Sequence, residues 1–159
     1  MKKIILKLLF LLTVFGCKTK ESEVYILPEN YTGYVVIIFD QDNGAKKKYE
    51  KGKRIYEIPP SGILKTQFKA DYGLSHFPEF YYKSIQNENK VPYIYEYDSL
   101  TNDKVVGFGG RSGVANRDLE GKSVVRFREF YIGTKVQIEL AVKEAEQLDI
   151  ISLTDGKSR

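Results

Sequence analysis

The chain has 159 residues, a formal net charge of +4 and one cysteine, so we expect one domain whose stability cannot come from intramolecular disulfides. Three of its 25 basic residues lie within residues 1–16, which contain no acid; without that segment, 22 basic residues face 21 acidic ones. This near balance excludes the electrostatic basis of nucleic-acid binding, which depends on neutralising many phosphates.

Residues 1–16 have the pattern of an export signal. Lys2 and Lys3 form a basic start, a short apolar stretch follows, and a small residue precedes the expected cleavage point. The apolar stretch is shorter than the roughly 20 residues that a membrane-spanning helix needs. The closing Val14-Phe15-Gly16-Cys17 resembles the lipobox of bacterial lipoproteins. That resemblance implies a mature protein that begins at Cys17 and is anchored to a membrane by acyl chains on its sulfur.

The chain is therefore divided into four parts. Residues 1–16 are the lipoprotein signal peptide, and residues 17–24 are a short lipidated tether of mixed charge. Residues 25–153 are expected to form a single β-rich domain. The polar residues 154–159 are expected to be a frayed tail.

Short strands separated by turns are predicted along most of the domain. The β-branched and aromatic run from Tyr34 to Phe39 predicts a central strand covered on both faces. Asn43-Gly44 predicts a tight turn after it. A glycine-rich loop is expected between the last two strands. The other predicted strands are residues 46–50, 54–58, 63–68, 93–97, 105–108 and 124–132.

The pattern changes to a helix after this series. Thr134 and Gln137 have the spacing of a capping box, and apolar residues then recur along one helical side, which predicts a helix over 135–148. Many short strands followed by one helix favour a mainly β fold, namely an antiparallel sandwich-like β domain with one C-terminal α-helix.

Two glycine-containing segments are weak candidates for phosphate or anion binding. Gly121-Lys122-Ser123 matches the end of a phosphate-binding loop, but Asn116 stands at the required earlier glycine and a strand pattern follows instead of a helix. The segment Gly107–Gly113 offers glycine amides and Arg111 for an anion, although its spacing does not match a dinucleotide fingerprint. A turn and a strand-connecting loop are the favoured interpretations.

His76 is the only histidine, and it lies between Asp71 and Glu79. A metal site or a catalytic triad needs more ligands or a nucleophile nearby. We therefore predict no catalytic residues, no metal site and no cofactor, while a hydrolase that uses carboxylates such as Asp71 and Glu79 remains an alternative.

Tyr93, Tyr95 and Tyr97 alternate and are predicted to share one face of a strand. The favoured interpretation is that the rings pack in the core and the tyrosine hydroxyls reach solvent at its edge. An exposed row would instead stack on sugar rings or pack against a partner protein.

A longer set of residues resembles a family of lipoprotein domains of unknown function from Bacteroidota-type bacteria. The most specific part is the run Tyr-x-Ile-Pro-x-x-Gly-Ile-Leu-x-Thr-Gln that starts at Tyr56. No activity is known for that family, so the resemblance implies no functional residues. Its turn residues Pro59 and Gly62 are expected to be structural. The matching positions begin at Leu27-Pro28-Glu29 and end at Thr66-Gln67-Phe68.

The sequence thus predicts a lipid-anchored cell-envelope protein of unknown molecular function, acting as a binding or structural module. Its expected contacts are the membrane, through Cys17, and an envelope protein or glycan. By resemblance to Gram-negative lipoproteins, Lys18 after the lipidated cysteine implies sorting to the outer membrane.

Overall fold

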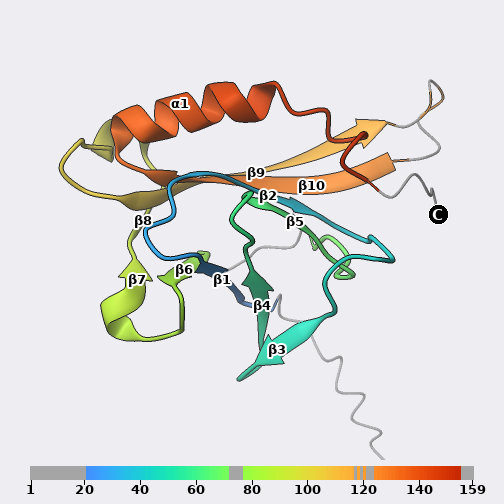
Figure 1. Cartoon of the computed structure of the whole chain (residues 1–159), viewed down its shortest axis with the longest axis horizontal. Coiled ribbons are helices and arrows are strands. Elements are labelled where there is room, and N and C mark those ends of the chain that lie inside the picture. Colours follow the sequence, from blue (N-terminus) through green and yellow to red (C-terminus); the bar gives the residue numbers. More distant parts are fainter. Residues whose placement is uncertain (1–20, 72–76, 117, 119, 121–123, 155–159) are drawn as a thin grey trace, which may run out of the picture.

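The computed structural model describes residues 21–71, 77–116, 118, 120 and 124–154. Two five-stranded sheets face each other, and one helix covers the outer side of the second sheet (Figure 1). The first sheet has the strand order β3 (Lys48–Glu50), β4 (Lys53–Glu57), β1 (Glu23–Leu27), β6 (Glu79–Tyr82) and β7 (Lys90–Val91). The second has the order β5 (Ile63–Lys65), β2 (Gly33–Ile38), β10 (Val124–Gly133), β9 (Val106–Asn116) and β8 (Tyr93–Ile94).

The prediction of a mainly β fold with one C-terminal helix is confirmed, but the sheets are mixed and not antiparallel. β1 pairs in parallel with both β4 and β6, and two parallel pairs also occur in the second sheet. The reason is topological. After β1 the chain crosses to the other sheet as β2, so β4 and β6 return later and flank β1 in its own direction. Parallel neighbours require such crossovers, which strand patterns alone do not reveal.

The core lies between the two sheets and consists largely of aromatic and β-branched side chains. Tyr25 stacks on Tyr56 and on Phe80 with ring centroids 5.0 Å apart in each case, and Phe130 meets Tyr25 edge-on from the opposite sheet. Such offset and edge-to-face pairs are the geometries that aromatic quadrupoles favour. The predicted central strand is confirmed as β2, whose last four residues are all buried.

Helix α1 (Lys135–Glu146) closes the outer face of the second sheet (Figure 1). Thr134 and Gln137 form the predicted capping box, in which the Thr134 amide donates to Gln137 Oε1 at 2.9 Å. The apolar side of the helix, through Ile138, Ala141 and Ala145, packs on a cluster that includes Val106 and Tyr131. The helix ends two residues earlier than predicted.

Two local predictions are wrong. The glycine-rich segment is not a loop but part of the 11-residue strand β9, where Gly113 leaves room for the Phe127 ring; a Cβ there would lie 2.2 Å from that ring. The strand predicted at 93–97 stops after Ile94, and a 3₁₀ turn, η2 (Tyr97–Ser99), follows. β1 begins at Glu23, near the expected end of the tether.

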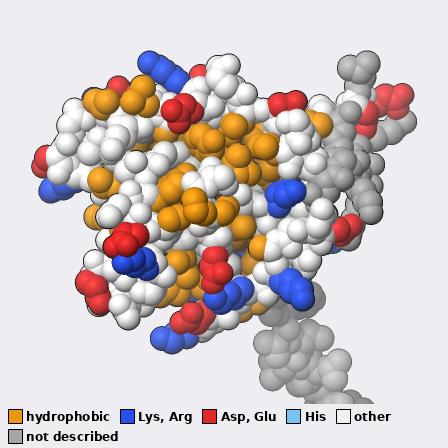
Figure 2. All heavy atoms as spheres, viewed as in Figure 1, with side chains coloured by type: hydrophobic (Ala, Val, Ile, Leu, Met, Phe, Trp, Pro, Cys, Tyr) orange, Lys and Arg blue, Asp and Glu red, His pale blue; other side chains and the backbone are white. Residues whose placement is uncertain are grey.

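On the face shown in Figure 2, hydrophobic side chains gather at the centre and charged side chains lie mostly toward the rim. Along the lower edge, where Figure 1 places β3 and β4, basic and acidic side chains lie side by side. A second 3₁₀ turn, η1 (Asn87–Asn89), precedes β7. Among the described residues, no helix combines the length and apolar character needed to cross a membrane.

Gly62 gives a test of the turn within the motif that begins at Tyr56. Its φ is +75°, and a Cβ would lie 2.1 Å from Tyr31 Oη and 2.3 Å from the Tyr34 carbonyl oxygen. We expect Gly62→Ala to lower the free energy of unfolding by about 2–4 kcal/mol, from the left-handed conformation and the overpacking together.

Gly52→Ala is the matched control for this measurement. Gly52 has nearly the same φ, +76°, but nothing lies within 4 Å of its Cβ position. Urea unfolding should therefore show a loss of only about 1–2 kcal/mol for Gly52→Ala, from strain alone. Equal losses for the two variants would contradict the packing role of Gly62.

Candidate functional site

The three predicted tyrosines do not form one row. Tyr93, on β8, is half-buried, and its hydroxyl donates a hydrogen bond to the Gly109 carbonyl at 2.6 Å. Tyr95 follows the strand and is 74% exposed. Tyr97 lies in η2 and donates to Glu139 on α1 at 2.6 Å. The strand ends before Tyr95, so the alternation that predicted a shared face does not continue.

Two of these tyrosines contact Phe77, which belongs to no sequence motif described above. Phe77 is 70% exposed, and its ring centroid lies 5.7 Å from that of Tyr93 and 6.4 Å from that of Tyr95. The three rings line a surface hollow of about 260 Å³, which we call the aromatic hollow. Its remaining lining residues are Pro78, Glu79, Lys90 and Val91.

The aromatic hollow carries one carboxylate and one ammonium group beside its rings. Partial burial alone raises the pKa of Glu79, but hydrogen bonds from Lys53 and from Tyr81, the latter at 2.9 Å, outweigh it and leave the pKa below its usual value. Lys90 Nζ lies 5.9 Å from the centre of the Tyr81 ring. Flat apolar faces beside fixed polar groups suit a ligand that is itself partly apolar and partly hydroxylated.

The same geometry argues against Glu79 as the general acid of a hydrolase. A general acid in such a reaction needs a raised pKa, because it must be protonated when the leaving group departs. Glu79 has a lowered pKa and is engaged by Lys53 and Tyr81. Asp71 contributes its carbonyl oxygen to Arg128. Glu79 is therefore placed as an ion-pair partner rather than as an acid catalyst.

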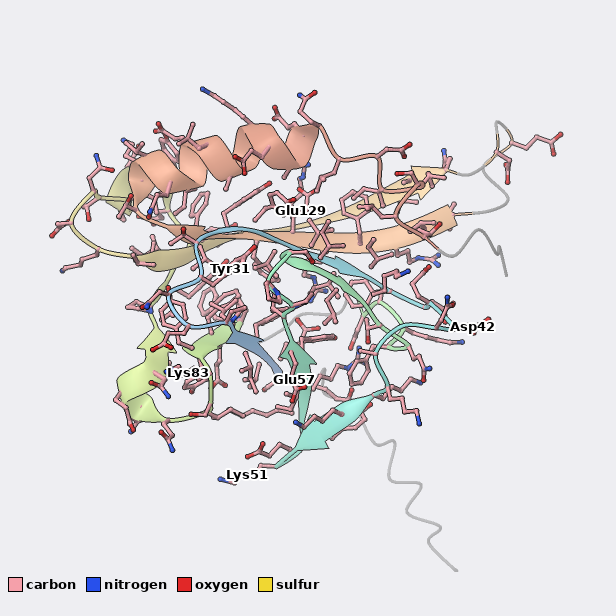
Figure 3. All side chains as sticks on the ribbon, in the orientation of Figure 1. Tyr31, Asp42, Lys51, Glu57, Lys83 and Glu129 are labelled. Carbon is pink, nitrogen blue, oxygen red and sulfur yellow. The ribbon has the colours of Figure 1, made fainter. Side chains whose placement is uncertain are left out.

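Arg111 is held within the sheet instead of lying in a free loop. Its Nε and Nη2 donate to Glu129 Oε2 at 3.0 and 2.8 Å, and Tyr131 donates to the same oxygen at 3.1 Å. Burial and the Glu129 carboxylate raise the pKa of Tyr131 to about 12, so its hydroxyl remains a donor. Glu129 itself is buried on β10 below α1 (Figure 3). The anion-binding alternative for this segment is therefore not supported, because Arg111 already binds a carboxylate.

A second ionic group lies between the two sheets. Arg128 on β10 forms an ion pair with Glu23 on β1, and both side chains are 7% exposed. Tyr25 donates to Glu23 Oε2 at 3.0 Å, and burial together with the Glu23 carboxylate raises its pKa well above the usual value. Arg128 also donates to the Asp71 carbonyl at 2.9 Å. With so little exposure, this group acts as a structural link between β1 and β10.

A larger groove, of about 550 Å³, lies between α1 and the start of β9. It is open and lined by both apolar and charged side chains, and the exposed Leu140 lies on the same helix. The lining residues are Tyr97, Phe108, Ile138, Glu139, Val142, Lys143 and Glu146.

Three predicted sites lie outside the described residues: Cys17, His76 and the segment Gly121-Lys122-Ser123. Within the described part of the chain, no three His, Cys, Asp or Glu side chains are placed together to hold a metal ion. No sequence motif links Phe77 and Lys90 to the tyrosines, because these residues come together only in the folded chain, where β6 pairs with β7.

Comparisons with known proteins give a family and one distant structural likeness. A family described as "Family of unknown function (DUF6843)" matches residues 19–140. No curated protein matches the chain. A crystal structure described as "Putative Lipoprotein from Bacillus anthracis" is 14% identical, with a TM-score of 0.46, over 70% of this chain and 69% of that one. This similarity is too low to support a conclusion about the fold or function of this chain.

Proposed function

The chain belongs to the DUF6843 family, whose function is unknown, and we propose that it is a lipid-anchored cell-envelope protein that binds a partner through the aromatic hollow. Residues 1–16 would be removed on export, and Cys17 would carry the acyl chains. The basic start, the short apolar stretch and the position of the one cysteine support this anchor. In a Gram-negative cell, Lys18 after the lipidated cysteine would favour the outer membrane as the location.

The exposure of Phe77 and Tyr95 is the observation that carries the binding role. Both large rings are more than two-thirds exposed, at 70% and 74%, although the domain has a core that contains other aromatic residues. Exposed aromatic groups beside a hollow are typical of contact surfaces, since a rigid ring gives a large contact area at a low entropic cost. The Phe77, Tyr93 and Tyr95 rings already contact one another, so a ligand would meet a preformed surface.

Glycan binding is the second candidate function. It specifies the chemical class of the partner that the aromatic hollow would bind. Aromatic faces stack on the apolar faces of sugar rings, while neighbouring charged groups bind their hydroxyls. Tyr95 is the most exposed of the three tyrosines, and Glu79 and Lys90 line the same hollow. These features favour a glycan over a purely apolar ligand.

Photocrosslinking in intact cells of the native host tests the binding role. With p-benzoylphenylalanine in place of Tyr95, we expect a crosslinked product from the hollow. Phe77→Ala in the same chain should lower its yield, because one aromatic contact contributes about 0.5–1.5 kcal/mol.

The matched control places the same photoreactive residue at Lys104, an exposed position in the loop before β9. A product that is sensitive to periodate identifies a glycan, and one that is sensitive to protease identifies a protein. Equal yields from positions 95 and 104, or no effect of Phe77→Ala, would contradict the proposal that the aromatic hollow is the binding surface.

A further inference from the structure

The segment that leads into β1 is held against the hairpin formed by β3 and β4. Arg54 Nε donates to Glu21 Oε2 at 2.6 Å, and the Tyr49 hydroxyl lies 3.4 Å from the same oxygen. Glu21 follows Cys17 by four residues, and four Cα–Cα steps span at most about 15 Å. Lipid on Cys17 would therefore keep this hairpin close to the bilayer, an inference that rests on the anchor proposed above.

The hairpin is basic, although the mature chain is nearly neutral. We define the basic hairpin as residues 46–57, which include β3, its turn and β4. Its acids are Glu50 and Glu57. Its bases are Lys46, Lys47, Lys48, Lys51, Lys53 and Arg54. Six bases against two acids in one exposed hairpin concentrate positive charge where the tether leaves the domain.

Part of this charge is neutralised within the domain. Lys48 pairs with Glu57, Lys53 with Glu79 and Arg54 with Glu21. Asp40 and Asp42 line an adjoining polar hollow together with Lys47 and Lys69.

Three exposed lysines of the basic hairpin have no ion-pair partner among the described residues: Lys46, Lys47 and Lys51. Lys51 extends into solvent at the hairpin tip, away from α1 and Glu129 (Figure 3). By contrast, Lys83, on the β6–β7 loop, pairs with Glu29.

We propose that the basic hairpin lies on the anionic headgroups of the membrane that holds Cys17. Ammonium groups near a negative bilayer surface gain electrostatic attraction, and lipidation together with basic residues anchors a protein more firmly than one acyl chain does. Tyr49, 50% exposed between the lysines, has the amphipathic ring that favours the headgroup region. The contact turns α1 away from the bilayer, because the helix covers the opposite side of the domain (Figure 1).

Vesicle partitioning tests the charge requirement. The chain from Cys17 onward, with its thiol blocked, should sediment with vesicles containing phosphatidylglycerol and far less with phosphatidylcholine alone. The triple variant K46Q/K47Q/K51Q should partition about 100-fold more weakly, since each lysine near an anionic surface contributes about fivefold. The control K83Q/K104Q/K143Q removes the same charge elsewhere and should partition almost normally.

Fluorescence tests the orientation. The chain has no tryptophan and one cysteine, so Tyr49→Trp is a unique reporter and Cys17 a unique point for coupling to a maleimide lipid. On coupled vesicles, brominated lipids should quench the introduced tryptophan when phosphatidylglycerol is present, and adding K46Q/K47Q/K51Q to the same chain should abolish that quenching. Equal quenching in both triple variants, or release by inorganic phosphate at constant ionic strength, would overturn the proposal. Because the anchor is chemical, either result is independent of whether cells lipidate Cys17.

Discussion

Replacing Arg128 with alanine should destabilise the domain by about 3–5 kcal/mol, the usual cost of removing one partner from a buried ion pair. Arg128 and Glu23 are each only 7% exposed, and Arg128 is the charged partner that Glu23 contacts directly. Without it, the Glu23 carboxylate would retain the Tyr25 hydroxyl as a donor, while its Oε1 already has no hydrogen-bond partner among the described residues. The measurement is urea unfolding of Arg128→Ala at neutral pH.

Arg126 provides a matched control on the same strand. It lies two residues before Arg128 on β10, and its side chain is exposed. Arg126→Ala should change the free energy of unfolding by less than about 0.5 kcal/mol, as is usual for surface positions. Similar effects of the two replacements would contradict the structural role assigned to Arg128.

Replacing both partners separates the cost of an unpaired charge from the value of the pair. In the double variant with Glu23→Leu and Arg128→Met, no buried charge is left alone, so most of the loss should be recovered. A double variant as unstable as Arg128→Ala would mean that the Arg128 contacts to Asp71 and to the Phe39 ring, rather than the ion pair, hold β1 to β10.

The strongest sequence patterns predicted the two central strands β2 and β10 of the second sheet and the helix that covers it. β2 and β10 are long runs of β-branched and aromatic residues, and α1 begins at a capping box that the structure contains. These signals are local, because they depend on side-chain type and spacing within one element. Strand direction depends instead on which strands the chain meets later, so the parallel pairing of β1 was not predicted.

Two predictions differ from the structure, one for a glycine-rich segment and one for a charged residue. Gly107–Gly113 was interpreted as a loop, but Gly109, Gly110 and Gly113 of β9 lie against the aromatic side chains of β10, where a larger side chain would not fit freely. Glu23 was assigned to the tether because that segment is short, polar and of mixed charge, whereas its partner Arg128 is 105 residues later in the chain. The aromatic hollow depends in the same way on Phe77, which is distant in sequence from Tyr93 and Tyr95.

Cys17→Ala should release the protein from membranes. Each buried methylene of an acyl chain contributes about 0.8 kcal/mol, so two or three chains account for nearly all of the membrane affinity. After cell fractionation and a high-salt wash, which screens the charge contact of the basic hairpin, we expect the wild-type chain in the membrane pellet and the variant almost wholly elsewhere. Lys18→Ala retains the cysteine and should remain in the pellet. Lys18→Asp should also remain there but move to the inner membrane, because the predicted sorting depends on a residue other than Asp after the cysteine.

Metabolic labelling with a palmitate analogue in the native host tests the anchor most directly. The wild-type chain and Lys18→Ala should both be labelled, and Cys17→Ala should carry no label, because Cys17 is the only thiol in the chain. A Cys17→Ala chain that is still labelled would contradict the central proposal, that this protein is held to the cell envelope by lipid on Cys17.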